Sequence, residues 1–298
     1  MNKTELLRQM GRIKVAIIGN SNSGKSTLVN ALCCKFVVPE LSHTSTWMTT
    51  YLGNASHLGA DCAVIGRNGY YRQYHYEEFR KELIYNEKII YEGQKSSGTN
   101  KYGFVHIKHL LGSRDVTLID SIGTGVNQYD AQRSAIVARQ ADIIVYVYDS
   151  SRSSNLIQNE IQFLKNELFP DGIKPRKPCQ RIFFVPNKID CVTSVTEICR
   201  TLRYSLQTLV SPQTLYYRQL ITNIIPISAL YGRIALTGIG SEPTSLSFSD
   251  QGKYEEVMQR WYFESEIRNN VISLREKSHI DSLIKAIKRE VKCIKLTK

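Results

Sequence analysis

The sequence predicts an α/β fold of three layers, in which helices flank a mostly parallel central sheet that carries insertions. Apolar runs alternate with amphipathic helical patterns, as in strands joined by crossover helices. The run at 142–148 predicts a buried strand, and apolar residues at helical spacing follow it at 157–168. Polar motifs follow several predicted strands, and ligands of such sheets bind at the carboxyl ends of the strands.

The predicted elements follow one another along the chain. Strands are predicted at 13–18, 116–119, 142–148, 181–186 and 224–227, and helices at 27–34, 157–168, 195–209, 254–261 and 278–296. Ser194 and Glu197 form a capping box at the start of one helix. The closing helix has an apolar stripe and a basic face. It could bind a membrane surface, but we expect it to pack on the domain with its charged face in solvent.

Two segments depart from a minimal domain and are expected to be mobile insertions, 53–104 and 236–251. Residues 1–298 are expected to form a single domain that includes both. The stretch Tyr70–Tyr76 interleaves aromatic and basic residues, which could stack on nucleic-acid bases. We prefer a half-buried helix here and do not expect a nucleic-acid partner.

The composition is that of a cytoplasmic protein with a sizeable core, since 42% of the 298 residues are hydrophobic. Residues 1–12 are charged, so no signal peptide is expected. No apolar run approaches the roughly 18 residues that span a bilayer. The seven cysteines include no C-x-x-C pair, which argues against a zinc site or a disulfide framework. The net charge of +12 suits a triphosphate, and it also suits an anionic membrane or an acidic partner.

A phosphate-binding loop follows the first predicted strand. Residues 19–26 read GNSNSGKS, which matches the pattern G-x-x-x-x-G-K-[ST] between a strand and a helix. Its glycines let backbone N–H groups point at phosphate oxygens, its lysine reaches the β- and γ-phosphates, and its serine hydroxyl binds Mg²⁺. The expected nucleotide contacts are Gly19, Asn20, Ser21, Asn22, Ser23, Gly24, Lys25, Ser26 and Thr27.

The next motif is Asp120-Ser-Ile-Gly123, a D-x-x-G sequence at the end of the predicted strand 116–119. We expect Asp120 to hold Mg²⁺ through a water. The N–H of Gly123 is expected to bind the γ-phosphate, so that hydrolysis releases the loop that follows.

The sequence Asn187-Lys-Ile-Asp190 after the fourth predicted strand indicates guanine. The carboxylate of Asp190 can accept from N1–H and from the exocyclic amine of guanine, whereas adenine offers no such donor pair. The stem of Lys188 can lie along the base. Ser228 and Ala229, after the strand at 224–227, are expected to bring backbone N–H groups near guanine O6.

On these motifs the chain resembles the translation-factor-related GTPases and, within them, the dynamin-like proteins of bacteria. The stretches that carry the resemblance are Asp120–Val126, the threonine-rich Leu41–Tyr51 and Pro226–Gly232. It implies a GTPase that hydrolyses GTP to GDP and phosphate with Mg²⁺. It also implies nucleotide-dependent association with a second copy or a related dynamin-like chain, and a peripheral position at a membrane.

The resemblance also suggests how water is oriented. Ras-like enzymes place a glutamine directly after D-x-x-G, whereas this chain has Thr124. Ser21 stands where dynamins have glutamine. Asn22 matches the asparagine that holds a potassium or sodium ion in related enzymes, although it could simply tie the loop together. Thr46 is the preferred Mg²⁺ ligand of the first switch, and Thr44, Thr49 and Thr50 remain alternatives.

Two other functions remain open at the level of sequence. The missing glutamine would suit a nucleotide-gated scaffold with little turnover. The net charge of +12 and Asn22 would suit a GTPase associated with the ribosome or RNA, whose binding would weaken with salt.

Overall fold

The fold was derived from a computed structural model. It describes residues 3–40, 48–66, 70–91, 101–124, 128–152, 156, 158–168, 181–209, 223–237 and 271–297. All statements below concern these residues.

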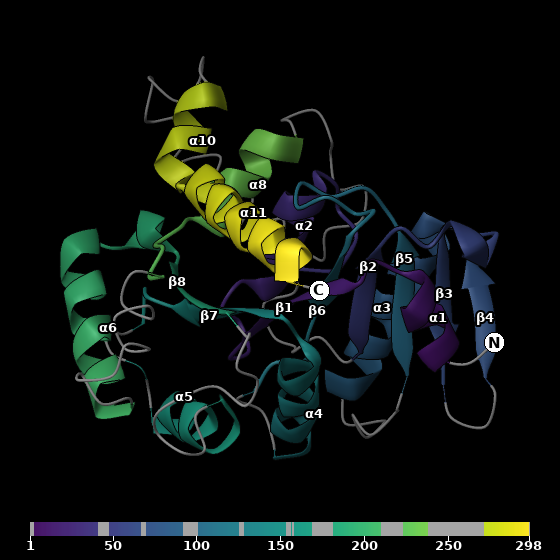
Figure 1. Cartoon of the computed structure of the whole chain (residues 1–298), viewed down its shortest axis with the longest axis horizontal. Helices are drawn as coiled ribbons and strands as arrows, with labels where there is room; N and C mark the ends of the chain where they lie inside the picture. Colours follow the sequence, from purple (N-terminus) through teal and green to yellow (C-terminus); the bar gives the residue numbers. More distant parts are fainter. Residues whose placement is uncertain are drawn as a thin grey trace.

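A single sheet of eight strands forms the middle layer, in the order β4-β3-β5-β2-β6-β1-β7-β8 (Figure 1). The strands are β1 Ile13–Gly19, β2 Thr49–Gly53, β3 Cys62–Ile65, β4 Tyr71–Tyr74, β5 Tyr102–His106, β6 Val116–Asp120, β7 Ile143–Asp149 and β8 Arg181–Asn187. The neighbours β6, β1, β7 and β8 run parallel, and so do β2 and β5. Pairing is antiparallel between β2 and β6 and on both sides of β3. The predicted mostly parallel sheet is therefore confirmed.

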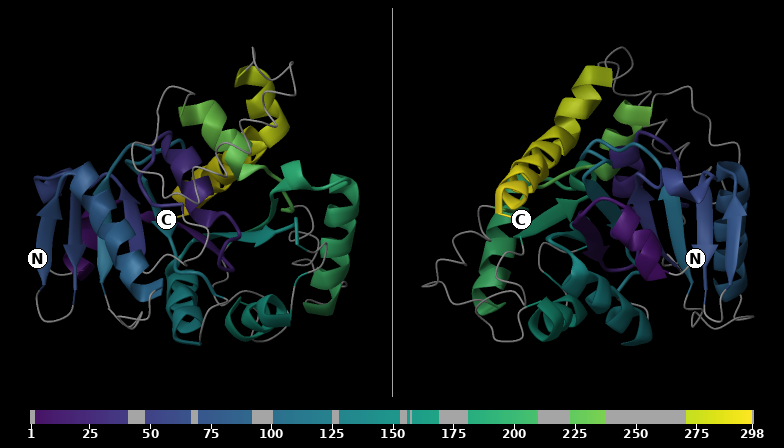
Figure 2. Two further views of the ribbon diagram at one scale, coloured as in Figure 1. Left: turned by 180° about the vertical axis from the view of Figure 1, so that it is seen from behind. Right: turned by 45° about the vertical axis from the view of Figure 1, so that its right-hand side comes forward.

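Helices cover both faces of this sheet, and Figure 2 shows the layers from two further directions. They are α1 Lys3–Gln9, α2 Lys25–Cys33, α3 Tyr76–Tyr91, α4 Gln128–Gln140, α5 Gln158–Phe163, α6 Val195–Leu209, α8 Ala229–Thr237, α10 Val271–Ser278 and α11 Ile280–Thr297. Single helical turns lie at Ser56–Leu58, Leu164–Leu168 and Ile189–Cys191.

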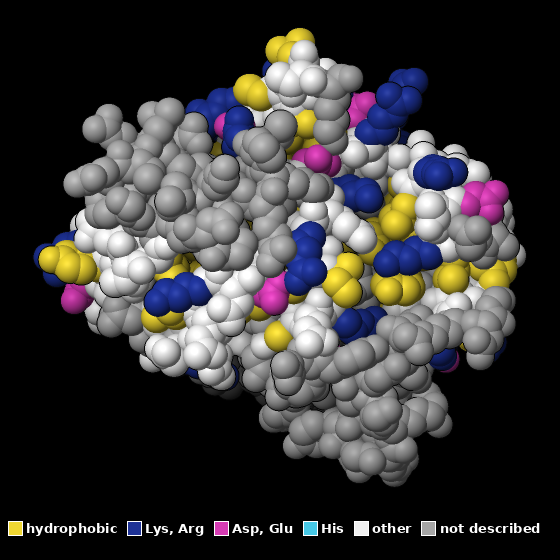
Figure 3. Space-filling model, turned by 60° about the horizontal axis from the view of Figure 1, so that its bottom comes forward, with side chains coloured by type: hydrophobic (Ala, Val, Ile, Leu, Met, Phe, Trp, Pro, Cys, Tyr) yellow, Lys and Arg dark blue, Asp and Glu magenta, His cyan; other side chains and the backbone are white. Residues whose placement is uncertain are grey.

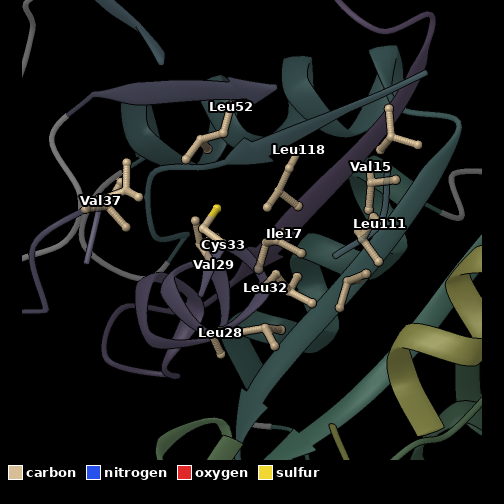
Figure 4. Packing of buried hydrophobic residues seen from close by; sticks show 14 of the residues in the cluster. Val15, Ile17, Leu28, Val29, Leu32, Cys33, Val37, Leu52, Leu111 and Leu118 are labelled. Atoms are coloured by element: carbon tan, nitrogen blue, oxygen red, sulfur yellow. The ribbon is translucent and has the colours of Figure 1, made fainter. Parts of the chain in front are cut away.

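Alternation along β1 separates two apolar cores. Val15 and Ile17 point into a core shared with α2, α3, α8 and α11, whereas Ala16 and Ile18 point into a core shared with α1, α4, α5 and α6. Figure 4 shows the first core around α2, where Leu28 and Leu32 lie near Ile17 and Leu118 of the sheet. Because α2 is anchored in this way, the loop that joins it to β1 has a fixed position.

The closing helix packs on the domain, as expected. The apolar stripe of α11 is buried in the first core, through Ile280, Leu283, Ile284, Ile287, Val291 and Ile294. Its lysines point to solvent. The N-cap bond of the predicted capping box is also present, since the N–H of Glu197 donates to Ser194 Oγ at 3.3 Å. The apolar stripe of α11 and the cap at Ser194 were therefore both identified correctly from the sequence.

The segment 53–104 is not simply an insertion, which corrects the prediction. It supplies β3, β4, α3 and the first part of β5, and β3 and β4 extend the main sheet. The stretch expected as a helix near Tyr70–Tyr76 is edge strand β4, in which Arg72 and Gln73 are exposed and Tyr74 is buried. Residues 92–100 lie outside the described part.

Two other predicted boundaries change. The strand expected at 224–227 is reduced to two isolated bridges to β8, Phe184 to Ile224 and Asn187 to Ile227. The N–H groups of Ile225 and Ile227 both donate to β8, whereas Pro186 of β8 has no N–H to donate in return. The insertion expected at 236–251 begins later, since α8 continues to Thr237. The rest of that insertion and the helix expected at 254–261 lie outside the described residues.

Candidate nucleotide site

The phosphate loop lies between β1 and α2 and depends on two glycines. Gly24 has φ of +89°, which favours glycine, and a Cβ at this position would collide with the side-chain amide of Asn187. A Cβ at Gly19 would collide with the carbonyl oxygen of Val147 in β7. Asn22 also has a positive φ, 63°, a conformation that asparagine tolerates better than most residues. The loop is therefore held closely between the sheet and the base motif.

Lys25 opens α2 and folds back over this loop. Its Nζ donates to the carbonyl oxygen of Asn20 at 2.6 Å, and only 5% of the residue is exposed. Burial lowers the pKa of Lys25 to about 8, although Asp120 and Glu160 oppose the shift. An anion bound in the loop would favour the charged form of Lys25, because its negative charge would stabilise an ammonium that burial has removed from water.

Asp120 and Ser26 meet at the carboxyl end of β6. Ser26 Oγ donates to Asp120 Oδ2 at 3.2 Å, and Asp120 is fully buried. The other carboxylate oxygen, Oδ1, is buried without a hydrogen-bond partner. Burial raises the pKa of Asp120 to about 7 despite Lys25 and the Ser26 hydroxyl. A hydroxyl and a carboxylate oxygen are ligands that suit Mg²⁺, so the residues present fit this metal.

The D-x-x-G segment lies directly against the phosphate loop. A Cβ at Gly123 would collide with Ser21 Oγ, and this hydroxyl is buried without a hydrogen-bond partner. The N–H of Thr124 donates to the carbonyl oxygen of Gly19 at 3.2 Å, and its hydroxyl donates to Asn20 Oδ1 at 3.4 Å. Thr124 is thus bonded to the loop, while Ser21 and Gly123 lie close together.

Asn187 joins the base motif to the rest of the site. Its Nδ2 donates to the carbonyl oxygen of Ser23 at 2.8 Å, and its Oδ1 accepts from the N–H of Ala229 at 2.8 Å. It ends β8 beside Asp149, which ends β7. This one side chain therefore connects the phosphate loop with the segment at 228–229.

The remaining base residues directly follow Asn187 or lie in the segment at 228–229. Lys188 has a positive φ of 66°. Asp190 follows in a short helical turn, and its Oδ1 is buried without a hydrogen-bond partner. Ser228 is fully buried, and its Oγ accepts from the N–H of Tyr231 at 3.2 Å, which caps α8.

One detail differs from the sequence prediction for O6. The N–H of Ser228 already donates to the carbonyl oxygen of Ser278 at 3.0 Å, and that of Ala229 donates to Asn187. In the following turn, the N–H of Tyr231 donates to Ser228 Oγ and that of Gly232 to the Ser228 carbonyl, which makes the N–H of Leu230 the better candidate for guanine O6.

The sequence prediction missed Asp149, which is a charged partner of Lys188. Asp149 Oδ2 lies 2.5 Å from Lys188 Nζ and 3.3 Å from Arg152 Nε. Nothing in the sequence links Asp149 to Lys188, because only the parallel pairing of β7 and β8 brings them together.

Thr44 and Thr46 lie outside the described residues. Thr49 and Thr50 are buried in β2, where Thr50 pairs with Asp120.

These features define a phosphate-loop GTPase domain. The sequence model of the dynamin family matches residues 15–189, more than half of the chain. The chain therefore belongs to the dynamin family. No sequence among the curated proteins matches it significantly.

Solved structures agree with this fold. Two chains of an oligomerised bacterial dynamin pair, described as sensing and tethering membranes, superpose with TM-scores of 0.51 and 0.54 at 16% identity. They cover 96% and 98% of this chain, but 44% and 50% of their own length. This chain thus spans half the length of these relatives or less. Era from Aquifex aeolicus covers 73% of this chain at 17% identity, with a TM-score of only 0.40.

Proposed function

We propose that this domain hydrolyses GTP to GDP and phosphate with Mg²⁺. The observation that carries the proposal is a pair of buried carboxylate oxygens without hydrogen-bond partners, one at each end of the site. Oδ1 of Asp120 lies beside the phosphate loop and suits a metal ion. Oδ1 of Asp190 belongs to the base motif and suits the N–H donors of guanine. Buried polar atoms are seldom left unpaired unless a ligand or water completes them.

The metal would be held by Ser26, Asp120 and a threonine of the first switch, for which Thr46 is preferred. A Mg²⁺ ion held there would supply positive charge that neutralises the charge developing on the phosphates during phosphoryl transfer. Lys25 adds a second positive charge at the same phosphates. Its ammonium would leave the carbonyl of Asn20 for the phosphates, a short movement within the loop.

The attacking water needs an orienting group other than glutamine. The hydroxyl and N–H of Thr124 are both bonded to the phosphate loop, which argues against that residue. Ser21 is better placed, because its unpaired hydroxyl lies against Gly123, whose N–H would bind the γ-phosphate. Asn22 would hold a potassium or sodium ion beside the phosphates. In this proposal Ser21, Asn22, Lys25, Thr46 and Gly123 form the catalytic set.

Self-association is the proposed consequence of the nucleotide cycle. Membership of the dynamin family and the oligomerised bacterial dynamin pair support a homodimer or a complex with a related chain. A cytoplasmic domain, peripheral at an anionic membrane, would suit this behaviour. None of the helices in the described part of the chain is both long and apolar enough to cross a bilayer. We also propose that residues 1–298 act as one dynamin-type GTPase domain.

Nucleic acid is a weaker partner for this surface. Figure 3 shows one face of the molecule, on which Lys and Arg side chains lie apart from one another among hydrophobic and other side chains. Phosphate backbones are bound by several basic groups along one track, and this face has no such continuous track among its described residues.

Phosphate release with Mg²⁺, measured for GTP and ATP over a range of protein concentrations, tests the proposal. We expect turnover of GTP alone, with a rate per molecule that rises with concentration. Ser26→Ala should abolish turnover, because it removes an oxygen ligand of the metal. A flat and negligible rate with tight GTP binding would instead indicate a nucleotide-gated scaffold, and equal use of ATP would overturn the guanine assignment.

A further inference from the structure

The D-x-x-G segment is attached to β1 on both sides of its central peptide group. Ser121 donates to the carbonyl oxygen of Ile17 from its N–H at 3.3 Å and from its hydroxyl at 2.8 Å. Further along, the N–H of Thr124 donates to the carbonyl oxygen of the last residue of β1 at 3.2 Å. Between these attachments lies the peptide that joins Ile122 to Gly123. It carries the N–H that we expect to bind the γ-phosphate, so its orientation decides where that donor points.

Helix α4 supplies a hydroxyl that bonds this peptide. Ser134 Oγ donates a hydrogen bond to the carbonyl oxygen of Ile122, and Ser134 is fully buried. Ser121 Oγ lies 3.3 Å from the same oxygen, but it has a single proton and makes a shorter bond of 2.8 Å to Ile17. Ser134 is therefore the main hydroxyl donor to the Ile122 carbonyl in the described part of the chain.

A bond to this carbonyl also orients the N–H of the same peptide. The peptide is trans, so its C=O and N–H bonds lie in one plane and point in opposite directions. Because the Ile122 carbonyl points to α4, the N–H of Gly123 points away from that helix. Gly123 also borders the phosphate loop, since a Cβ on it would lie 2.4 Å from Ser21 Oγ.

The peptide would turn easily without the bond from Ser134. Glycine at position 123 lets the peptide reorient at little steric cost. The attachments of Ser121 and Thr124 do not prevent this, because a peptide group can rotate about the single bonds on either side of it. Helix α4 is a firm support for the serine, since Ala135 and Ala138 are fully buried in the second core.

We propose that Ser134 is a positioning residue that fixes the Ile122–Gly123 peptide and thereby presents the Gly123 N–H to the γ-phosphate. The inference rests on the proposed GTPase function and extends it to a residue outside the nucleotide motifs. A donor that is oriented in advance costs no reorganisation when charge develops during the reaction. GDP lacks the γ-phosphate, so the effect of Ser134 should appear only with a triphosphate.

Ser134→Ala tests this role, because it removes the hydroxyl and alanine suits a helix. The measurements are the affinities for GDP and for a non-hydrolysable GTP analogue, and kcat for GTP, with Mg²⁺ at one protein concentration. Complete removal of an oriented donor typically lowers kcat by about 100- to 1000-fold, so we expect a loosened donor to lower it by about 10-fold. The analogue should also bind about 10-fold more weakly, whereas the affinity for GDP should stay unchanged.

Thr117→Val is the matched control. The Thr117 hydroxyl is also buried and donates to a backbone carbonyl, that of Gly11, at 2.8 Å. Thr117 lies near the start of β6, at the other end of the strand from Asp120. Its loss should leave kcat and the ratio of the two affinities unchanged, even if stability falls. Ser134→Cys keeps a weaker donor and should give intermediate losses, so it decides the question if Ser134→Ala fails to fold.

The outcomes separate this role from the proposed function. A kcat and an affinity ratio in Ser134→Ala equal to those of the unmutated protein would overturn the positioning role. Equal losses in Thr117→Val, or a parallel loss of GDP and analogue affinity in Ser134→Ala, would do the same. If the unmutated protein binds and hydrolyses GTP, the proposed function stands in each of these cases. If it does neither, the proposed function and this inference both fail.

Discussion

Asn187 and Ser23 are joined by a hydrogen bond of 2.8 Å from the asparagine amide to the serine carbonyl. The bond spans two motifs that are 164 residues apart in the sequence, one for the base and one for the phosphates. The same amide would collide with a Cβ at Gly24. The separation of the two halves of the site is therefore set by the protein before a nucleotide arrives, which reduces the ordering cost of binding.

Asn187→Ala should be destabilising. It leaves the Ser23 carbonyl and the Ala229 N–H without their partner, and each buried unpaired group costs about 1–3 kcal/mol. We expect a loss of about 2–4 kcal/mol in urea unfolding and weaker GDP binding. Asn223→Ala, which removes one partly buried bond to the carbonyl of Ile182, should cost less. Equal losses in the two variants would contradict the bridging role of Asn187.

Gly24→Ala should abolish nucleotide binding through a collision as well as through backbone strain. Gly112 offers a matched control, because its φ of +95° is similar but a Cβ there would have no atom within 4 Å. Strain alone should cost Gly112→Ala about 1–2 kcal/mol with GDP affinity retained. Melting temperatures and GDP affinities of both variants check this. If Gly24→Ala binds GDP as tightly as Gly112→Ala does, the close contact with Asn187 is unimportant.

Asp190→Asn should shift the preference from guanine to xanthine nucleotides. The amide can donate to the oxygen that xanthine carries in place of the guanine amine, whereas it cannot accept both guanine donors. Competition between GDP and XDP measures the preference, and we expect about a 100-fold change or more in the ratio. An unchanged ratio would mean that Asp190 does not contact the base.

The sequence predicted the elements with strong local patterns and the motifs that follow them. The alternation of side chains along β1 and the apolar stripe of α11 depend only on residues close in the sequence, so they could be identified without the structure. Strand β3 and the edge strand β4 were missed, because such short patterns indicate strands only when the neighbouring strand β5 is known. The contacts of Lys188 with Asp149 and of Glu40 with Arg233 were also missed. Each joins segments far apart in the chain, and only the folded sheet and the packed helices bring them together.

Asp120→Asn should change how the stability of the nucleotide-free protein depends on pH. The pKa of Asp120 is raised to about 7 by burial, whereas that of an unfolded aspartate is about 4. The folded state therefore holds a proton that the unfolded state has lost between these values, and stability from this group falls as pH rises from about 4 to about 7. Asparagine does not titrate, so the variant should gain stability relative to the unmutated protein over this window.

Urea unfolding without Mg²⁺ at pH 5, 6 and 7 measures this difference, which we expect to grow by about 1–3 kcal/mol in total. The series stops at pH 7 because the pKa of Lys25 is about 8. The variant should also lose its response to Mg²⁺. A difference that stays constant from pH 5 to pH 7 would show that the Asp120 carboxyl titrates normally.

The role of Asn22 can be separated from its backbone conformation. A positive φ of 63° explains an asparagine here without any cation, since asparagine tolerates this conformation. Asn22→Gly keeps the conformation and removes the amide, whereas Asn22→Ala removes the amide and adds strain. If the amide holds a potassium or sodium ion near the phosphates, both variants should lose the dependence of turnover on the monovalent cation and still bind GDP.

Rates at fixed ionic strength in potassium, sodium and choline salts measure this dependence. Identical rates of the unmutated protein in all three salts would favour an arginine from a partner protein, and a cation effect retained in Asn22→Gly would assign the asparagine to the turn alone.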